Sequence, residues 1–243
     1  MFSIYSKLKS GVWPAFRNQK GKFMKENLTY IIFVVDRSGS MSSICKDMIG
    51  GFNAFIKKQK LVPGDCKVFF YQFNTEYNTV YTALDLNRVP DLTDKTYVPQ
   101  GGTALYPSLG MTIENIGKML ANTSEDDRPG KVLFVTITDG EDNSILWKID
   151  GIIASHDFHQ FRCDQVKSMI EHQTQVYNWD FAYIGANQDA WAVGSSMGVA
   201  NNLNYVASSK GVEDMFDNLE KSTATYRSSK DKVSFKFEAE KSV

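Results

Sequence analysis

Oxygen-bearing side chains gather in three short polar segments of this sequence. The first segment has the pattern Asp-x-Ser-x-Ser, the second reads Gly-Gly-Thr, and the third reads Thr-Asp-Gly. Hydroxyl and carboxylate oxygens are hard ligands, which suit Mg²⁺, Mn²⁺ or Ca²⁺ and are poorly matched to soft metals. The side chains with this chemistry are Asp36, Ser38, Ser40, Thr103 and Asp139. They are therefore the candidate ligands of a divalent cation.

The charge and the number of these side chains fit such an ion. Asp36 and Asp139 supply negative charge, which would offset the charge of the cation and its repulsion from a helix N-terminus. The three hydroxyl side chains would supply neutral oxygens. Mg²⁺ takes about six oxygen ligands. The candidate set is smaller than that, so at least one position is left for water or for a group from another molecule.

Two apolar runs in the sequence would position the first and third polar segments. Residues 28–35 (LTYIIFVV) and 132–138 (VLFVTIT) are typical of strands buried on both faces of a parallel sheet. Each run leads directly into a polar segment, whereas residues 101–103 open a predicted helix. In doubly wound sheets ligands bind beyond the carboxyl ends of the strands. We therefore expect the three polar segments to meet at that edge.

The rest of the chain alternates between predicted strands and helices. We expect further strands at 67–73, 76–86, 179–185 and 203–206, and helices at 41–60, 104–120, 158–177, 187–197 and 212–226. Ser42 or Ser43 is expected to cap the first helix. The short link Asn74-Thr75 predicts a hairpin, which adds one antiparallel strand. The pattern predicts an α/β fold with a doubly wound, mostly parallel sheet flanked by helices.

The three polar segments together resemble the metal-ion-dependent adhesion site of von Willebrand factor type A domains. They are residues 36–40, 101–103 and 138–140, and all five ligand positions of that site are present in the right order. The resemblance covers roughly residues 28–206, and the chain looks most like the small, free-standing intracellular members from bacteria and phages. It implies the Rossmann-like fold of these domains.

The resemblance also implies a role for each matched residue. Ser38 and Ser40 would bind the ion directly, the two aspartates would often act through water, and Thr103 would switch between direct and water-mediated contact. Gly101 and Gly102 would let the backbone approach the ion closely.

Glu141 and Asp142 lie beside the third polar segment. They are interpreted as a solvated acidic rim, with tuning of the ligands as the alternative.

The function implied is that of a protein-binding module and not of an enzyme. An Asp or Glu of a partner protein would complete the coordination of Mg²⁺, or of Mn²⁺ or Ca²⁺. One alternative is a metal-dependent hydrolase or phosphotransfer enzyme, in which the ion polarises a phosphoryl oxygen. The sequence offers no convincing general base near the strand ends for that reaction. The other alternative is a scaffold with a structural or vestigial metal site.

Composition excludes several other classes of protein. The chain has 243 residues with 27 Lys+Arg against 28 Asp+Glu, so it lacks the broad basic field of a nucleic-acid binder. No apolar run reaches the roughly 20 residues of a membrane span, and no secretory signal is recognisable. The three cysteines, Cys45, Cys66 and Cys163, show no CxxC spacing and argue against a disulfide scaffold. We expect a cytoplasmic protein, and the sequence leaves its oligomeric state open.

The domain organisation expected is one domain with two extensions. Residues 1–25 form a basic N-terminal extension without an acidic residue, residues 26–227 form the domain, and residues 228–243 form a polar, loose tail. Three interpretations of the extension stay open. It is an anchor for an anionic surface, a disordered leader, or a segment upstream of a true start at Met24.

Overall fold

The computed structural model describes residues 25–143, 161–186, 190–229 and 233–238. Among these residues the strands form one sheet in the order β3-β2-β1-β4-β5-β6. The strands are β1 (Lys25–Asp36), β2 (Asp65–Phe73), β3 (Tyr77–Asp85), β4 (Pro129–Thr138), β5 (Asp180–Ala186) and β6 (Asn201–Tyr205). All neighbouring pairs are parallel except β2 and β3, which form the predicted hairpin. The predicted fold class is confirmed.

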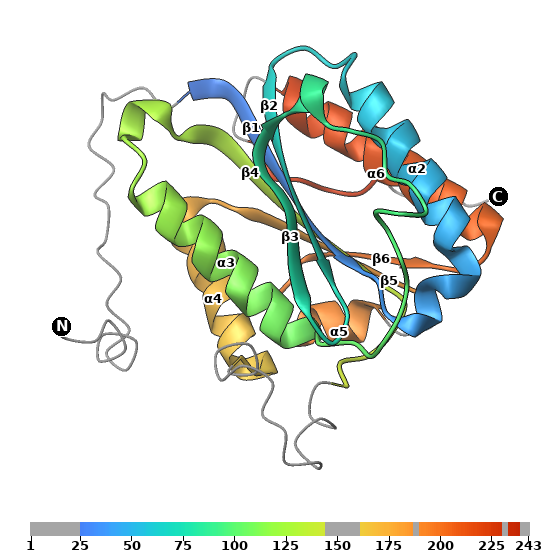
Figure 1. Cartoon of the computed structure of the whole chain (residues 1–243). Helices are drawn as coiled ribbons and strands as arrows, with labels where there is room; N and C mark the ends of the chain where they lie inside the picture. The colour runs from blue at the N-terminus through green and yellow to red at the C-terminus, as the bar shows by residue number, and fades with distance from the viewer. Residues whose placement is uncertain (1–24, 144–160, 187–189, 230–232, 239–243) are drawn as a thin grey trace.

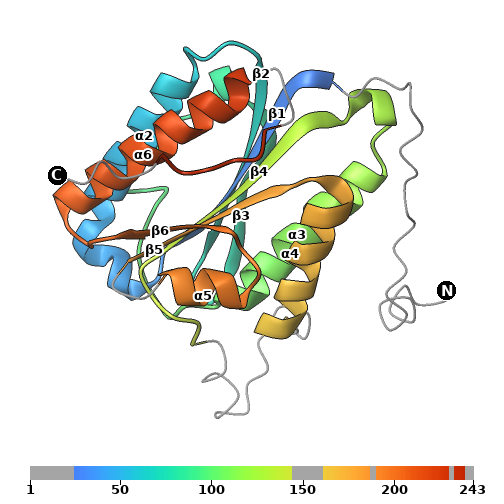
Figure 2. The ribbon, with the colours of Figure 1, turned by 180° about the vertical axis from the view of Figure 1, so that it is seen from behind.

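Helices cover both faces of this sheet (Figures 1 and 2). One face carries α2 (Cys45–Gln59) and α6 (Ser209–Ser228), which pack against each other. The opposite face carries α3 (Leu105–Ala121) and α4 (Cys163–Tyr177), together with the short α5 (Ala190–Ser196). The sheet therefore separates two apolar cores, one under each helical layer.

Strand β1 lies in the middle of the sheet and contributes to both cores. Ile31, Phe33 and Val35 belong to the core under α2 and α6. Ile32 and Val34 belong to the core on the opposite face. This alternation explains why the run reads as continuously apolar, because a central parallel strand has no face in contact with water.

The order of the strands reverses between β1 and β4. The chain builds the sheet outward from β1 in one direction and outward from β4 in the other. Pairing of Val35 with Ile137 brings the carboxyl ends of these two strands side by side. Such a switch point is where open α/β sheets bind ligands. Asp36 directly follows Val35 and Asp139 comes two residues after Ile137, so their expected placement at one edge is confirmed.

The helix predicted from residue 41 begins differently. Residues Gly39–Ile44 form a 3₁₀ helix, and α2 starts only at Cys45. The Ser42 hydroxyl donates to the Gly39 carbonyl at 2.7 Å, and Ile44 precedes α2 without a side-chain cap. The predicted capping role was wrong because the chain enters the helix through a tighter turn, which buries Met41 and Ile44.

Parts of three other predictions lie outside the described residues. The basic extension and the start at Met24 fall almost entirely within residues 1–24, and the start of the helix predicted at 158–177 falls within 144–160. Within the described part, Phe161 and Arg162 are not helical, and α4 begins after them. The helix predicted at 187–197 is described only from Ala190 onward.

The tail predicted as loose packs against the domain at residues 233–238. Phe235 is 1% exposed, and its ring lies 5.9 Å from that of Tyr226 in an edge-on arrangement. The backbone N–H of Phe235 donates to Asp180 Oδ1 at 3.0 Å. The prediction of a loose tail was wrong for this stretch. Apolar residues alternate at Val233, Phe235 and Phe237, which is the pattern of an extended segment with one buried face.

The cysteines in the described part of the chain are free. Burial raises the pKa of the Cys66 thiol to about 12, so this side chain is an unreactive apolar group at neutral pH. None of the described helices combines the length with the hydropathy that crossing a bilayer requires.

The contact between α2 and α6 gives a first prediction. A Cβ on Gly51 would lie 2.1 Å from a ring carbon of Phe216, whereas a Cβ on Gly50 would meet nothing within 4 Å. We expect Gly51→Ala to lower the free energy of unfolding by about 1–3 kcal/mol through overpacking. Gly50→Ala should raise it by about 0.5–1 kcal/mol, because alanine is the better helix former. Urea unfolding of both variants tests this, and equal effects would contradict the packing.

The docked tail gives a second prediction. Replacing Phe235 by Ala should cost about 3–5 kcal/mol of unfolding free energy, because a large buried ring is removed. Val233→Ala is the matched control, since Val233 is 50% exposed and should change stability by less than about 0.5 kcal/mol. A loss in the control as large as that of Phe235→Ala would show that the tail is held in another way.

Candidate metal centre

Backbone hydrogen bonds join the three polar segments at the carboxyl edge of the sheet. The Gly39 N–H donates to the Gly101 carbonyl at 3.0 Å, and the Gln100 N–H donates to the Arg37 carbonyl at 2.8 Å. The third segment is tied in through Asn143, whose N–H donates to the Thr103 carbonyl at 2.9 Å. The loop that opens α3 is thus held between the ends of β1 and β4.

The side chains of the candidate ligands come together on this backbone frame. The Ser38 and Ser40 hydroxyl oxygens are 3.0 Å apart, and the Ser40 hydroxyl donates to Asp139 Oδ1 at 2.7 Å. The Thr103 hydroxyl borders the same space, because a Cβ on Gly140 would lie 3.4 Å from it and 3.9 Å from the Ser40 hydroxyl.

Asp36 supports this group from a buried position at the end of β1. Its side chain is inaccessible to solvent, and each carboxylate oxygen accepts a hydrogen bond. The Ser38 N–H donates to Oδ1 at 2.6 Å, and the Thr138 hydroxyl donates to Oδ2 at 2.6 Å. The structure therefore brings together all five residues singled out in the sequence.

Burial makes the two carboxylates of this centre electrostatically costly. It raises the pKa of Asp36 to about 6, with a smaller contribution from the charge of Asp139. Burial likewise raises the pKa of Asp139. Among the described residues, the charged side chain that acts most strongly on Asp36 is this second carboxylate. Hard oxygen donors with excess negative charge fit a divalent cation.

Thr138 and Asn74 are supporting residues that sequence reasoning missed. Thr138 was noted only as part of the Thr-Asp-Gly pattern, yet its buried hydroxyl orients Asp36. Asn74 was interpreted only as a hairpin link. Its side-chain amide donates to the Gln100 carbonyl at 2.8 Å, and its backbone carbonyl accepts from the Ala104 N–H at 2.8 Å. Asn74 thus holds both ends of the Gly-Gly-Thr loop. These contacts join residues far apart in the chain, so they leave no local sequence pattern.

Two further residues hold the segments that carry the candidate ligands, and no sequence pattern pointed to either of them. The Asn143 side chain accepts from the Thr103 N–H at 2.7 Å, which completes a two-way clasp between these residues. The Tyr97 hydroxyl donates to the Asp36 carbonyl and is almost fully buried. Both contacts join residues that are far apart in the chain, so only the folded structure reveals them.

The two glycines of the loop differ in their conformational roles. Gly101 has a φ of +74°, a region that favours glycine, and its carbonyl accepts the hydrogen bond from Gly39. Gly102 has no positive φ. Gly101 is therefore the residue of this pair whose backbone conformation favours glycine. Close approach of either backbone to an ion stays a prediction.

The two acidic residues after Gly140, Glu141 and Asp142, also differ in their surroundings. Glu141 is exposed, as expected of a solvated rim. Asp142 is half-buried, and its Oδ1 accepts from the Tyr106 N–H at 3.3 Å in the first turn of α3. A negative charge at that position is favoured by the helix dipole, so Asp142 also stabilises the start of α3.

No protein-family model matches the chain, and no curated protein matches it in sequence. Solved structures do match its fold. A mutant of the PilB minor pilin from Streptococcus sanguinis superposes with a TM-score of 0.57 at 11% identity, over 87% of this chain and 64% of the pilin.

Two further structures match at similar levels. Proximal thread matrix protein 1 from the mussel byssus, with a zinc-occupied MIDAS motif, has a TM-score of 0.54 at 13% identity, over 83% of this chain and 47% of that protein. The vWF domain of the type V pili tip protein Mfa5 from Porphyromonas gingivalis has a TM-score of 0.53 at 11% identity, over 85% of this chain and 98% of that domain.

These likenesses define the fold of the chain. It is a von Willebrand factor type A fold, the six-stranded Rossmann-like sheet described above. The chain spans less than two thirds of the pilin and about half of the byssus protein.

The buried carboxylate pair gives a third prediction. In the presence of a chelator, Asp139→Asn should unfold at the same temperature as the wild type or higher, because one of two buried negative charges is removed. Mg²⁺ at about 100 times its Kd should stabilise the wild type by about 2.7 kcal/mol and the variant hardly at all. Thermal unfolding with EDTA and with MgCl₂ measures both effects.

The control for this prediction is Glu141→Gln, which removes an exposed neighbouring charge. This variant should keep the full response to Mg²⁺. A marked loss of stability of Asp139→Asn in chelator, with the Mg²⁺ response intact, would mean that Asp139 has only a structural role.

Proposed function

We propose that this chain is a divalent-cation-dependent protein-binding module. Ser38, Ser40 and Thr103 would hold Mg²⁺, or Mn²⁺ or Ca²⁺, with Asp36 and Asp139 balancing its charge. The bound ion supplies an electrophilic position for a carboxylate from outside the chain. The partner would be a protein that presents an Asp or Glu side chain.

The observation that carries this proposal is the contact between Ser40 and Asp139. It brings the Ser40 hydroxyl oxygen within 2.7 Å of an Asp139 carboxylate oxygen at the switch point of the sheet. The two residues are 99 positions apart in the sequence. The Ser40 hydroxyl donates a hydrogen bond to the carboxylate, so the lone pairs of the hydroxyl oxygen stay available to a cation. A second hydroxyl, that of Ser38, lies 3.0 Å away.

The hydrogen bonds of Asp36 support an indirect role for this carboxylate. Both of its oxygens already accept a hydrogen bond, one from the Ser38 N–H and one from the Thr138 hydroxyl. A carboxylate oxygen has a second lone pair, which can accept from a water molecule. A carboxylate that acts through water transfers less charge to the ion and leaves it readier to accept an acidic group from a partner.

A metal site in one structural neighbour is consistent with the proposal. The byssus protein carries zinc in its MIDAS motif on the same fold. The likeness of this chain to that protein is one of fold, so its metal chemistry is a guide to the test and not an assignment.

We propose no catalytic role for the chain. The histidine in the described part, His172, lies in the second half of α4, which runs from the carboxyl edge back toward the start of β5. A general base has to reach the reacting group, and His172 lies toward the amino ends of the strands, away from the candidate metal centre. A cytoplasmic location stays a prediction from the sequence.

A peptide-display experiment tests the binding function. A library with one position fixed as Asp or Glu is selected on the immobilised chain in MgCl₂ and eluted with EDTA. A parallel library fixes Asn or Gln at that position. We expect enrichment only from the acidic library, because the amides carry no charge for the ion.

Variants of the chain complete the design. Asp36→Ala and Asp139→Ala should abolish peptide capture while thermal unfolding stays cooperative, and Thr103→Ala should weaken it strongly. Glu141→Gln should behave as the wild type. Enrichment of the amide library, or capture that survives EDTA, would overturn the proposal.

A further inference from the structure

Tyr205 carries a buried hydroxyl that has no hydrogen-bond partner in the described part of the chain. It is the last residue of β6, and its side chain is 7% exposed. Buried polar groups are nearly always paired, and an unpaired one in a folded protein calls for an explanation. Another buried tyrosine near the site, Tyr97, does have a partner, the Asp36 carbonyl.

The register of the sheet places Tyr205 beside the candidate metal centre. Tyr205 pairs with Ala186 on β5, and Gly185 pairs with Thr138 on β4. Continued by one residue, this register sets Asp139, Ala186 and Tyr205 in one row across the strands. Neighbouring strands are about 4.8 Å apart, so the two ends of the row are separated by about 10 Å at Cα.

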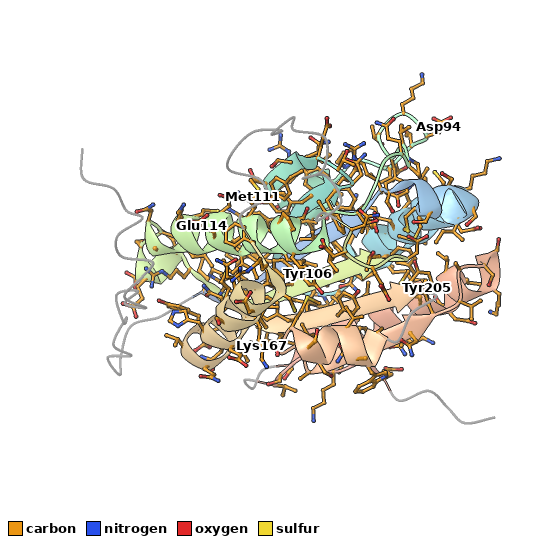
Figure 3. All side chains as sticks on the ribbon, turned by 90° about the horizontal axis from the view of Figure 1, so that it is seen from below. Asp94, Tyr106, Met111, Glu114, Lys167 and Tyr205 are labelled. Carbon is orange, nitrogen blue, oxygen red and sulfur yellow. The ribbon has the colours of Figure 1, made fainter. Side chains whose placement is uncertain are left out.

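The residue between them is small. Ala186 carries only a methyl group, and it belongs with Tyr205 to the core under α2 and α6. Ile137 belongs to the same core, and the alternation of side chains directs residue 139 to that face as well. Figure 3 shows Tyr205 on β6, close to the α2 and α6 side of the molecule. A tyrosine side chain is long enough to span most of the row.

Electrostatics are consistent with this placement. Burial raises the pKa of Tyr205 far above its ordinary value, and the charges of Asp139 and Asp36 raise it further. The phenol is therefore protonated at neutral pH and available as a donor. The one side-chain hydroxyl in the described part that donates to Asp139 is that of Ser40, which contacts Oδ1.

We propose that Tyr205 is a positioning residue of the metal centre. Its O–H donates to the Asp139 carboxylate, directly or through one water molecule, when a divalent cation is bound. This hydrogen bond fixes the orientation of Asp139 relative to the ion. The inference rests on the proposed metal-dependent function, and it explains why a tyrosine, instead of an apolar residue, ends β6.

Tyr205→Phe tests this role because it removes only the hydroxyl group. Calorimetric titration of chelator-stripped protein with MgCl₂ and with MnCl₂ should show a loss of affinity of about tenfold or more, the usual effect of removing a group that orients a ligand. Thermal unfolding in EDTA should show no loss of stability, because no paired hydrogen bond is removed from the metal-free protein.

The chain offers a matched control in Tyr81→Phe. Tyr81 lies on the hairpin strand β3, and its buried hydroxyl also has no partner among the described residues. This variant should bind both metals as the wild type does. A near-ultraviolet difference spectrum adds a direct readout. Addition of Mg²⁺ should change the tyrosine absorption of the wild type, and this change should be lost in Tyr205→Phe.

The possible outcomes separate the two proposals. Unchanged metal affinity in Tyr205→Phe, with the wild type binding metal, would overturn the role of Tyr205 and leave the binding module intact. A marked loss of stability in EDTA would show a structural hydrogen bond instead. If the wild type binds neither metal, this result would overturn both the proposed metal centre and the proposed role of Tyr205.

Discussion

Two carboxylates buried side by side are the constraint on which the rest of this structure depends. Asp36 ends β1, Asp139 directly follows the adjacent parallel strand β4, and burial raises the pKa of each. Like charges held in a poorly solvated place oppose folding unless hydrogen bonds or a cation offset them. The chain provides part of that compensation through Ser38, Thr138 and Ser40. In the proposed metal centre a divalent cation would provide the remainder, and its affinity would come from the same arrangement that makes the metal-free centre costly.

The loops around this centre are held together by hydrogen bonds between their polar groups. Asn74 and Asn143 hold the loop that carries Thr103, one from just after β2 and one from beyond β4. Tyr97 ties the backbone of Asp36 from the side of α2. Such a frame positions oxygen donors before any ligand arrives, which lowers the entropy lost on binding. The proposed hydrogen bond from Tyr205 extends this frame to the last strand of the sheet.

Predictions from the sequence succeeded where the signal was local and periodic. The apolar runs at 28–35 and 132–138 are central strands, and the short link after residue 73 is a hairpin. Predictions failed where a tertiary contact decided the conformation. Ser42 bonds within a 3₁₀ turn instead of capping α2. Phe235, in the tail that was expected to be loose, packs against Tyr226. The alternating apolar residues around Phe235 were a usable signal that was missed.

The sequence by itself determined the class of fold and the five candidate oxygen ligands, because strand periodicity and donor chemistry are properties of short segments. Only the tertiary structure decided which residues serve those ligands. Asn74, Thr138 and Asn143 act on groups that the fold brings to them from distant parts of the chain. Hydrogen bonds of this kind leave no spacing rule in a sequence, because a buried polar atom requires a partner of the right chemistry and geometry but not at any fixed distance along the chain.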